Sequence, residues 1–170
     1  DCAEQAGADI IWRPAELADD NAPLQPVIAH AMETDNGVDL VCLVLATAVL
    51  LHPARLANAY KMLVEDSTLD YVIGIRRFES SPRRAMKRDE AGIVSMQSPE
   101  NFNVRSQDFA PLYYDAGQFS FGRHSAWLSG QPSFTMRTHG MELPRGEAVD
   151  IDEPEDLAFA RSLFEARFTK

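Results

Sequence analysis

The stretch VDLVCLVL, residues 38–45, decides the fold class of this chain. An apolar run of this length is typical of a central parallel β-strand that is covered on both faces. From about residue 23 to 34, apolar side chains recur at helical spacing and predict an amphipathic helix. Pro53 opens a second predicted helix, and residues 71–75 form the next predicted strand. Strands and helices that alternate in this way predict an α/β fold with a mainly parallel sheet.

Further elements are predicted on either side of this central region. Residues 1–8 have the composition of a helix end, with Gly7 as the C-cap, and residues 8–12 follow as a short apolar strand. The remaining predicted elements are strands over 117–122, 137–143 and 148–151, a short helix over 125–129, and a final helix after Pro154.

The alternation of strands and helices ends after Phe78. Residues 79–106 are polar, and a turn at 89–92 followed by an apolar return strand at 93–96 predicts a hairpin-like arm. An arm with little core of its own is either a mobile loop or a dimer contact. Its basic residues are interpreted as a solvated face rather than a binding patch; they are Arg83, Arg84, Lys87 and Arg88.

Bulk composition restricts the class of protein. A length of 170 residues fits one domain, residues 1–170. The formal net charge of −10 argues against a nucleic-acid partner, and no apolar run is long enough to span a membrane. Cys2 and Cys42 are the only cysteines, which makes a disulfide framework improbable and indicates a reducing, cytoplasmic setting.

An acidic pair, Asp150-Ile151-Asp152, stands directly before the final predicted helix. Alternation along a strand end would send the side chains of residues 150 and 152 to the same face. Carboxylates that close raise each other's pKa unless a cation lies between them, and Mg²⁺ commonly takes one or two protein carboxylates. In the alternative interpretation, Asp152 caps the helix and Asp150 is a solvated strand end.

Two other polar clusters stand out, at residues 105–108 and 113–119. In the run Arg105-Ser106-Gln107-Asp108, the arginine is either a bidentate grip for a carboxylate or phosphate or one half of a structural Arg–Asp pair. Tyr113, Tyr114 and Asp115 precede the run Gly117-Gln118-Phe119, and this mixture suits either a small polar ligand or the packing of an edge strand. The sequence has no zinc-ligand spacing, no Gly-x-Ser-x-Gly elbow and no glycine-rich phosphate loop.

Taken together, these motifs resemble the CMP-nonulosonic acid synthetases, also called acylneuraminate cytidylyltransferases. Their order and spacing agree over nearly the whole chain, and the run Asp-Ala-Gly-Gln-Phe is specific to the pseudaminic acid cytidylyltransferase branch. The matching segments are 13–20, 26–31, 105–108, 115–119 and 150–152.

The resemblance implies a fold, a reaction and an assembly. The fold is the Rossmann-like nucleotide-diphosphosugar transferase fold, with residues 79–106 as a dimerisation arm. The reaction couples CTP to a nonulosonic acid, pseudaminic or sialic acid, and gives the CMP-sugar and pyrophosphate for cell-surface glycan biosynthesis. Family members are homodimers, and no nucleic acid or membrane partner is expected.

The resemblance also assigns roles to residues. Asp150 and Asp152 would hold Mg²⁺ or Mn²⁺, and Asp152 and Arg105 are the expected catalytic residues. The substrate-binding residues that it implies are Arg105, Gln107, Asp115, Gln118 and Phe119.

The sequence departs from the family pattern in three places. The N-terminal phosphate-binding segment, rich in Arg, Gly, Ser and Lys, has no match here. Residues 45–50 lack the aromatic residue and the proline that usually flank Ala-Thr-Ala in this branch, and Ser120 stands where a Tyr is more usual. The expected alternatives are therefore a truncated transferase and a non-catalytic sugar-binding remnant without the CTP site.

Overall fold

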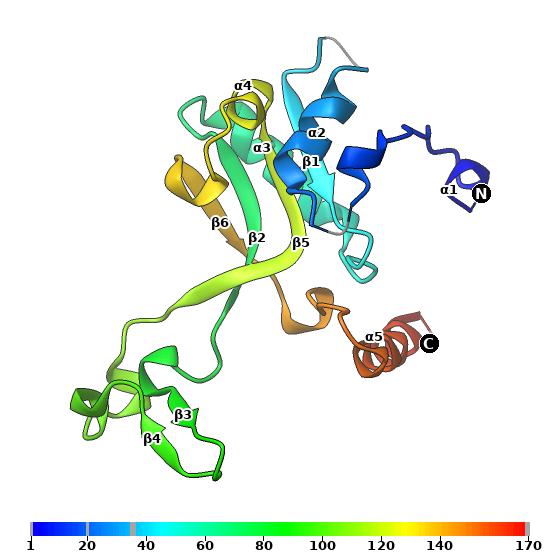
Figure 1. The fold of residues 1–170 in the computed structure, drawn as a ribbon. Helices are drawn as coiled ribbons and strands as arrows, with labels where there is room; N and C mark the ends of the chain where they lie inside the picture. Colours follow the sequence, from blue (N-terminus) through cyan, green and yellow to red (C-terminus); the bar gives the residue numbers. More distant parts are fainter. Residues whose placement is uncertain (1, 20, 35–36, 169–170) are drawn as a thin grey trace. The chain divides into compact units, whose positions relative to one another are not determined.

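The computed structural model describes residues 2–19, 21–34 and 37–168 (Figure 1). Its helices are α1 (Cys2–Gln5), α2 (Leu24–Met32), α3 (Pro53–Glu65), α4 (His124–Leu128) and α5 (Pro154–Phe168). Its strands are β1 (Leu40–Val44), β2 (Tyr71–Arg77), β3 (Met86–Arg88), β4 (Val94–Met96), β5 (Tyr113–Arg123) and β6 (Thr138–Glu142). Helices and strands mix along the chain, so the α/β prediction is confirmed.

The larger sheet has the strand order β1-β5-β2-β6. Strand β5 runs antiparallel to its neighbours β1 and β2, whereas β2 and β6 run parallel. These directions follow from backbone hydrogen bonds that run from His124 N to Asp39 O, Leu45 N to Gln118 O, Arg123 N to Asp70 O, Phe78 N to Leu112 O, Asp70 N to Arg137 O and Leu143 N to Ile75 O. The sheet is therefore mixed, with β1, β2 and β6 pointing one way.

The chain divides into two compact units. The first comprises Asp1–Leu43, Leu56–Val72 and Ser120–His139, and the second comprises Val44–Arg55, Ile73–Phe119 and Gly140–Lys170. The division passes through β1, β2, β5 and β6.

The core of the first unit forms around Tyr71. The ring of Trp127 meets that of Tyr71 edge to face at 5.0 Å between centroids, and Gly122 leaves the space, because a Cβ there would overlap the Tyr71 ring. Helix α3 adds Leu63 to this core and ends where the Arg123 guanidinium donates to the Leu63 carbonyl oxygen at 2.6 Å. Arg123 thus provides the donors that the last turn of α3 needs.

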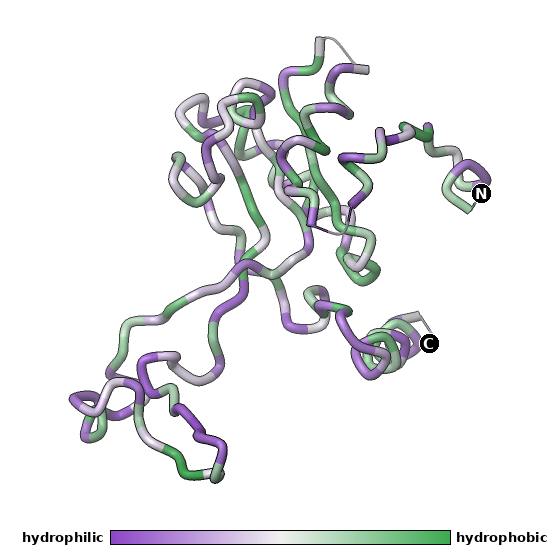
Figure 2. The backbone as a smooth tube through the Cα atoms, viewed as in Figure 1, coloured by the Kyte–Doolittle hydropathy of each residue, from purple (hydrophilic) through white to green (hydrophobic). Residues whose placement is uncertain are grey.

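The core of the second unit has two parts. Gly74 of β2 lies against Phe119 and Leu143, and any Cβ at this glycine would be too close to the Leu143 side chain. A smaller cluster buries Leu50, Val149 and Ala160, with Ile151 and Leu163 packed against it. Figure 2 shows hydrophilic and hydrophobic residues mixed around α5, and the apolar side chains of Leu157, Phe159 and Phe164 in this helix are exposed.

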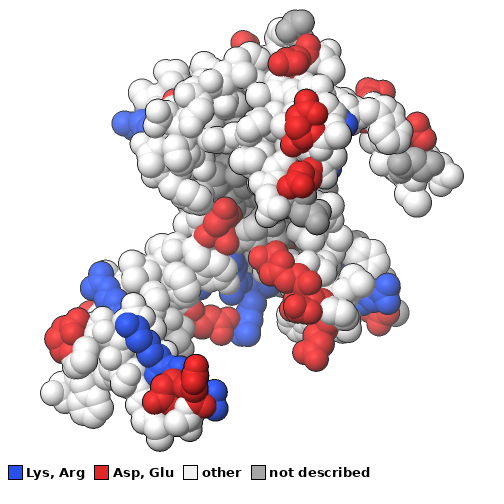
Figure 3. Space-filling model, viewed as in Figure 1, with Lys and Arg blue, Asp and Glu red and all other residues white. Residues whose placement is uncertain are grey.

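The arm, residues 79–106, belongs to the second unit. Strands β3 and β4 pair antiparallel with Lys87 opposite Ser95, and Gly92 adopts φ 86° in the turn between them. Basic and acidic side chains lie side by side on the face of the arm seen in Figure 3. The hairpin prediction is confirmed, and so is the solvent exposure of its basic side chains.

Three details differ from the sequence-based expectations. Residues 8–12 and 148–151 are not strands, and β1 lies at one end of the described sheet rather than at its centre. An apolar run forms a strand only where a neighbouring strand pairs with its backbone N–H and C=O groups. In 148–151, the carbonyl of Val149 accepts instead from the side chain of Gln118.

Across the ranges that the structure describes, no helix has the length and apolar character needed to cross a bilayer.

Candidate functional site

The segment before helix α5 presents its two aspartates to solvent. Val149 and Ile151 face the small core, whereas Asp150 and Asp152 between and after them are exposed. Burial therefore alternates along the segment, as expected for an extended chain even without a strand partner. The two carboxylates share one face, which confirms the predicted geometry.

Asp150 lies directly against the backbone of β5. At Gly117, a Cβ would stand 3.4 Å from both carboxylate oxygens of Asp150, and the glycine adopts φ 60°. The Gly117 amide donates to Asp115 Oδ1 at 3.0 Å. Between the bond from Arg123 N to Asp70 O and the bond from Phe78 N to Leu112 O, β5 has more residues than β2, so β5 is bulged within this stretch, which contains Gly117. Asp115 and Asp150 thus both lie beside Gly117, and together with Asp152 they are called the acidic cluster.

Burial and neighbouring carboxylates, which repel its charge, raise the pKa of Asp150. Burial is the first cause that raises the pKa of Asp150, followed by the charges of Asp152 and Asp156 and, more weakly, Asp115. A hydrogen bond from the Ile151 amide offsets part of this rise. A divalent cation beside Asp150 would reverse the shift, because it favours the ionised carboxylate.

Asp156, and not Asp152, caps helix α5. Asp156 Oδ2 accepts from the backbone amides of Glu153 at 2.9 Å and Asp152 at 3.2 Å. The interpretation of Asp152 as the N-cap is therefore wrong, because the capping carboxylate reaches back from the first turn. The Asp152 carboxylate is left facing solvent.

Gln118 and Phe119, both predicted to bind substrate, lie in the interior of the second unit. Gln118 is 1% exposed, and its Nε2 donates to the carbonyl oxygens of Ala116, Gly117 and Val149 at 3.0 to 3.2 Å. Its Oε1 is buried without a hydrogen-bond partner in the described part of the chain. Phe119 is 2% exposed beside Gly74. Gln118 thus ties β5 to the segment that carries Asp150, and ligand contacts for both residues stay predictions.

Arg105 and Gln107 are exposed at the base of the arm. Arg105 Nε and Nη2 contact the Asp108 carboxylate at 2.9 and 3.3 Å, a bidentate pair. The structural Arg–Asp pair is therefore present, and nothing in the described ranges joins Arg105 or Gln107 to the acidic cluster. Nearby, the ring of Tyr114 packs against Phe78 at 4.9 Å between centroids.

Glu147 supports the site and was not singled out from the sequence. Its carboxylate is 6% exposed and accepts from Arg55 Nε at 2.8 Å and Nη2 at 3.1 Å. Arg167 Nη2 of α5 lies 3.5 Å from the same carboxylate. The hydrogen bond from Arg55 is the first cause that lowers the pKa of Glu147. Its partners are remote in the sequence, so no local signal identifies this residue.

The donors present fit a Mg²⁺ ion. Mg²⁺ usually takes one or two protein carboxylates and completes its octahedral shell with water and phosphate oxygens. Asp150 and Asp152 supply two carboxylates on one exposed face. Within residues 2–19, 21–34 and 37–168, no group of three His, Cys, Asp or Glu side chains gathers around one point, so an all-protein cage is not formed.

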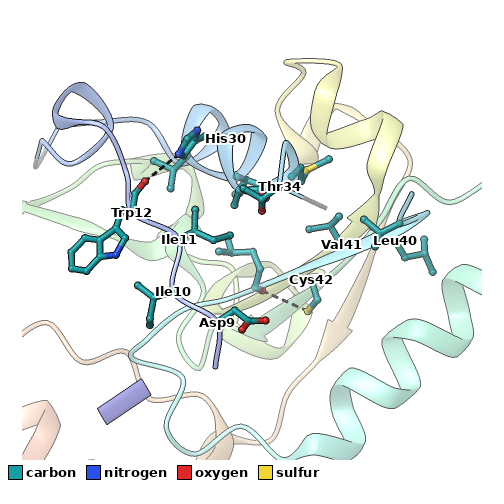
Figure 4. A pocket seen from close by; sticks show the side chains of 15 residues that line it. Asp9, Ile10, Ile11, Trp12, His30, Thr34, Leu40, Val41 and Cys42 are labelled. Atoms are coloured by element: carbon teal, nitrogen blue, oxygen red, sulfur yellow. Dashed lines mark hydrogen bonds between the residues drawn. The ribbon is translucent and has the colours of Figure 1, made fainter. Parts of the chain in front are cut away.

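A cavity of about 950 Å³ lies in the first unit. Figure 4 shows it between α2, β1 and residues 9–12, with the His30 ring turned toward the carbonyl oxygen of Trp12. Its lining is mainly apolar, and burial raises the pKa of the Cys42 thiol to about 11, so this thiol is not an activated nucleophile. The acidic cluster of the second unit is the better candidate site.

Comparison with known proteins identifies the family. No protein-family model matches the chain. The pseudaminic acid cytidylyltransferase of Campylobacter jejuni serotype O:2 is 34% identical over 156 residues, which cover 89% of this chain and 67% of the relative. The chain belongs to the CMP-nonulosonic acid synthetase family. It spans about two thirds of the length of that relative.

Two further proteins are similar to the chain, one in sequence and one in fold. N-acylneuraminate cytidylyltransferase B of Danio rerio is 27% identical over 160 residues, covering 91% of this chain and 36% of the relative. A solved structure of CMP:2-keto-3-deoxy-manno-octonic acid synthetase in complex with CTP superposes with a TM-score of 0.62. It shares 11% identity and covers 88% of this chain and 70% of that one, so it shows the fold alone. The Rossmann-like nucleotidyltransferase fold is thus confirmed.

Proposed function

We propose that this protein transfers the cytidylyl group of CTP to a nonulosonic acid, giving the CMP-sugar and pyrophosphate. The observation that carries the proposal is the acidic cluster, in which Asp150 lies against Gly117 with Asp152 on the same exposed face. The sugar hydroxyl would attack the α-phosphorus in line while pyrophosphate leaves. The Campylobacter relative is a pseudaminic acid cytidylyltransferase, which supports this reaction class.

Asp150 and Asp152 are the residues that would hold Mg²⁺ or Mn²⁺. When bound, the cation would neutralise charge on phosphate oxygens. The protein's own contribution is to fix the carboxylates: Val149 and Ile151 anchor the segment in the core, and Gln118 Nε2 holds the Val149 carbonyl oxygen at 3.2 Å. Arg105, Gln107 and Asp115 are proposed to face the sugar acid, as the resemblance implies.

Pseudaminic acid is the proposed sugar, ahead of sialic acid. The pseudaminic acid cytidylyltransferase of Campylobacter jejuni is 34% identical to this chain, and the N-acylneuraminate cytidylyltransferase of Danio rerio is 27% identical. The run Asp115-Ala116-Gly117-Gln118-Phe119, specific to the pseudaminic branch, contains Gly117, which lies against Asp150.

A homodimer is proposed, with the arm as the contact. Met86, Ile93 and Phe102 of the arm are largely exposed, and Ile93 is 67% exposed. Apolar side chains in an arm with little core of its own are stabilised by a second copy. A cytoplasmic location is also proposed, because Cys2 and Cys42 are free thiols.

The test is a pyrophosphate-release assay with CTP and Mg²⁺, run in parallel with pseudaminic acid and with N-acetylneuraminic acid. Release is expected with pseudaminic acid and not without a sugar acid. If the sugar acid binds by calorimetry but no pyrophosphate is released, the chain is the sugar-binding module and the transferase proposal is wrong.

A further inference from the structure

A polar cavity of about 460 Å³ lies in the second unit, at the ends of β2 and β6. It is lined by three arginines and two glutamates, namely Arg76, Arg77, Arg145, Glu79 and Glu142. Strands β2 and β6 are parallel neighbours, and both end beside the cavity. In α/β sheets, ligands bind in the crevice beyond the carboxyl ends of such strands.

Arg76 is the most unusual residue of this cavity. It is 9% exposed, and its Nε is buried without a hydrogen-bond partner among the described residues. Its Nη2 lies 3.6 Å from Glu79 Oε1, so only part of the guanidinium is compensated. A buried arginine donor without an acceptor is costly, and such groups in native proteins indicate a missing partner.

The charges around Arg76 favour an anion as that partner. Glu79 Oε1 also lies 3.1 Å from Arg145 Nε, so a single carboxylate oxygen faces two guanidinium groups. Counted over the lining, three guanidinium groups face two carboxylates, which leaves one positive charge in excess. This excess is notable in a chain with a formal net charge of −10. One excess charge matches a singly charged group better than a triphosphate.

We propose that this cavity is a binding site for a small oxyanion, either a carboxylate or a phosphate group. The oxyanion accepts from the guanidinium groups of Arg76 and Arg145, which both line the cavity, in the manner of charge-assisted recognition by arginine. None of the residues assigned to the metal or the sugar acid lines this cavity. It does not depend on the proposed cytidylyl transfer, because its ligand needs no CTP and no turnover.

The experiment is an NMR titration of the arginine Nε–Hε signals of the whole chain, with inorganic phosphate and, separately, with pyruvate. The Arg76 signal is identified by its loss in Arg76→Lys. We expect this signal to move in a saturable way with at least one of the two anions. A shift with phosphate alone identifies a phosphate group, a shift with pyruvate alone identifies a carboxylate, and a shift with both identifies a general oxyanion site.

Two variants that each remove one positive charge distinguish a specific anion site from non-specific electrostatic attraction. Arg145 has an exposed side chain, so Arg145→Gln should fold, and it should weaken anion binding about tenfold, the equivalent of one charge-assisted hydrogen bond. Arg137 is exposed in the first unit and lies 3.9 Å from Asp66. Arg137→Gln removes the same charge and should leave binding unchanged. No saturable shift with either anion, or equal weakening by both variants, would overturn the proposal.

Discussion

Gly117 is the residue on which the geometry of the acidic cluster depends most directly. It combines a left-handed φ of 60° with a carboxylate at van der Waals distance from the position of a Cβ. The two constraints are separable, because Gly130 has φ 69° and nothing within 4 Å of its Cβ position. Glycine is therefore required at 117 both for the backbone conformation and for the approach of Asp150.

Replacing Gly117 by Ala should lower the free energy of unfolding by about 1 to 2 kcal/mol, because a Cβ disfavours the left-handed conformation. Gly130→Ala should lose a similar amount from the conformation alone, whereas Gly146→Ala, with free space and no positive φ, should be neutral. Urea unfolding of the three variants measures these values. Only Gly117→Ala should also weaken Mg²⁺ binding, and equal metal binding by all three would refute the role of the Gly117–Asp150 approach.

Asp150 should make the folded protein less stable as the pH rises. Its folded-state pKa is raised above the usual 3.8, chiefly by burial and by Asp152. The folded state therefore holds this proton more tightly than the unfolded state, and stability falls as pH rises from 3.8 through the raised pKa. Asp150→Asn should remove this part of the dependence.

At neutral pH, Mg²⁺ should offset the loss of stability that comes from the ionised Asp150 carboxylate. The melting temperature of the unmodified chain should rise on addition of Mg²⁺, and that of Asp150→Asn should rise much less, because a cation that binds the folded state stabilises it by mass action. The exposed Glu155→Gln in the first turn of α5 serves as the control. An equal rise in all three proteins would place the metal elsewhere.

At the scale of elements, a buried ion pair secures the segment that leads to the acidic cluster. Glu147 receives a bidentate contact from Arg55 at the start of α3, and Arg167 of α5 donates to the Leu50 carbonyl oxygen at 2.9 Å while facing the same carboxylate. Three parts of the second unit thus meet at one buried carboxylate. Breaking such a pair leaves buried charge without compensation.

Glu147→Gln should lower the free energy of unfolding by about 2 kcal/mol at neutral pH, the scale of a lost charged hydrogen bond. The pKa of Glu147 is lowered from 4.5, so its stabilising effect is present above 4.5 and is lost as pH falls through the folded-state value. The variant and the unmodified chain should therefore converge in acid. Glu65→Gln, which removes an exposed pair with Lys61, should change stability by less than about 0.5 kcal/mol.

The helices and the arm were predictable from local signals, and several strands were not. Pro53 and the apolar stripes identify α2 and α3, and the turn residues up to Gly92 identify the hairpin. Residues 8–12 and 148–151 have the apolar character of strands but lack a strand neighbour in the described chain. Pairing is set by partners far away in the sequence, which hydrophobic pattern alone does not reveal.

The candidate site, like the fold, could be predicted only in part. Alternation placed Asp150 and Asp152 on one face, and the structure confirms it through the burial of Val149 and Ile151. The alternative in which Asp152 caps the helix is wrong, because the carboxylate at the helix start is that of Asp156, which accepts from the amides of Glu153 and Asp152. Glu147 could not be found, since Arg55 stands 92 positions away.

At the scale of the whole molecule, the arm should hold two copies together. Ile93→Glu places a charge in the exposed apolar part of the arm and should shift the protein from dimer to monomer in sedimentation equilibrium. Val64→Glu, at an exposed apolar position on α3, is the matched control and should remain dimeric. A monomeric unmodified protein, or a dimer that tolerates Ile93→Glu, would contradict the proposed contact.

Asp150 and Asp152 are proposed to form the catalytic metal site of a cytidylyltransferase. The most direct measurement compares kcat for pyrophosphate release, with CTP, Mg²⁺ and pseudaminic acid, between the unmodified chain and Asp152→Asn, with Glu155→Gln as control. We predict that Asp152→Asn lowers kcat about a hundredfold or more while sugar-acid binding by calorimetry changes little, and that the control keeps full activity. Near-normal turnover by Asp152→Asn would contradict the assignment.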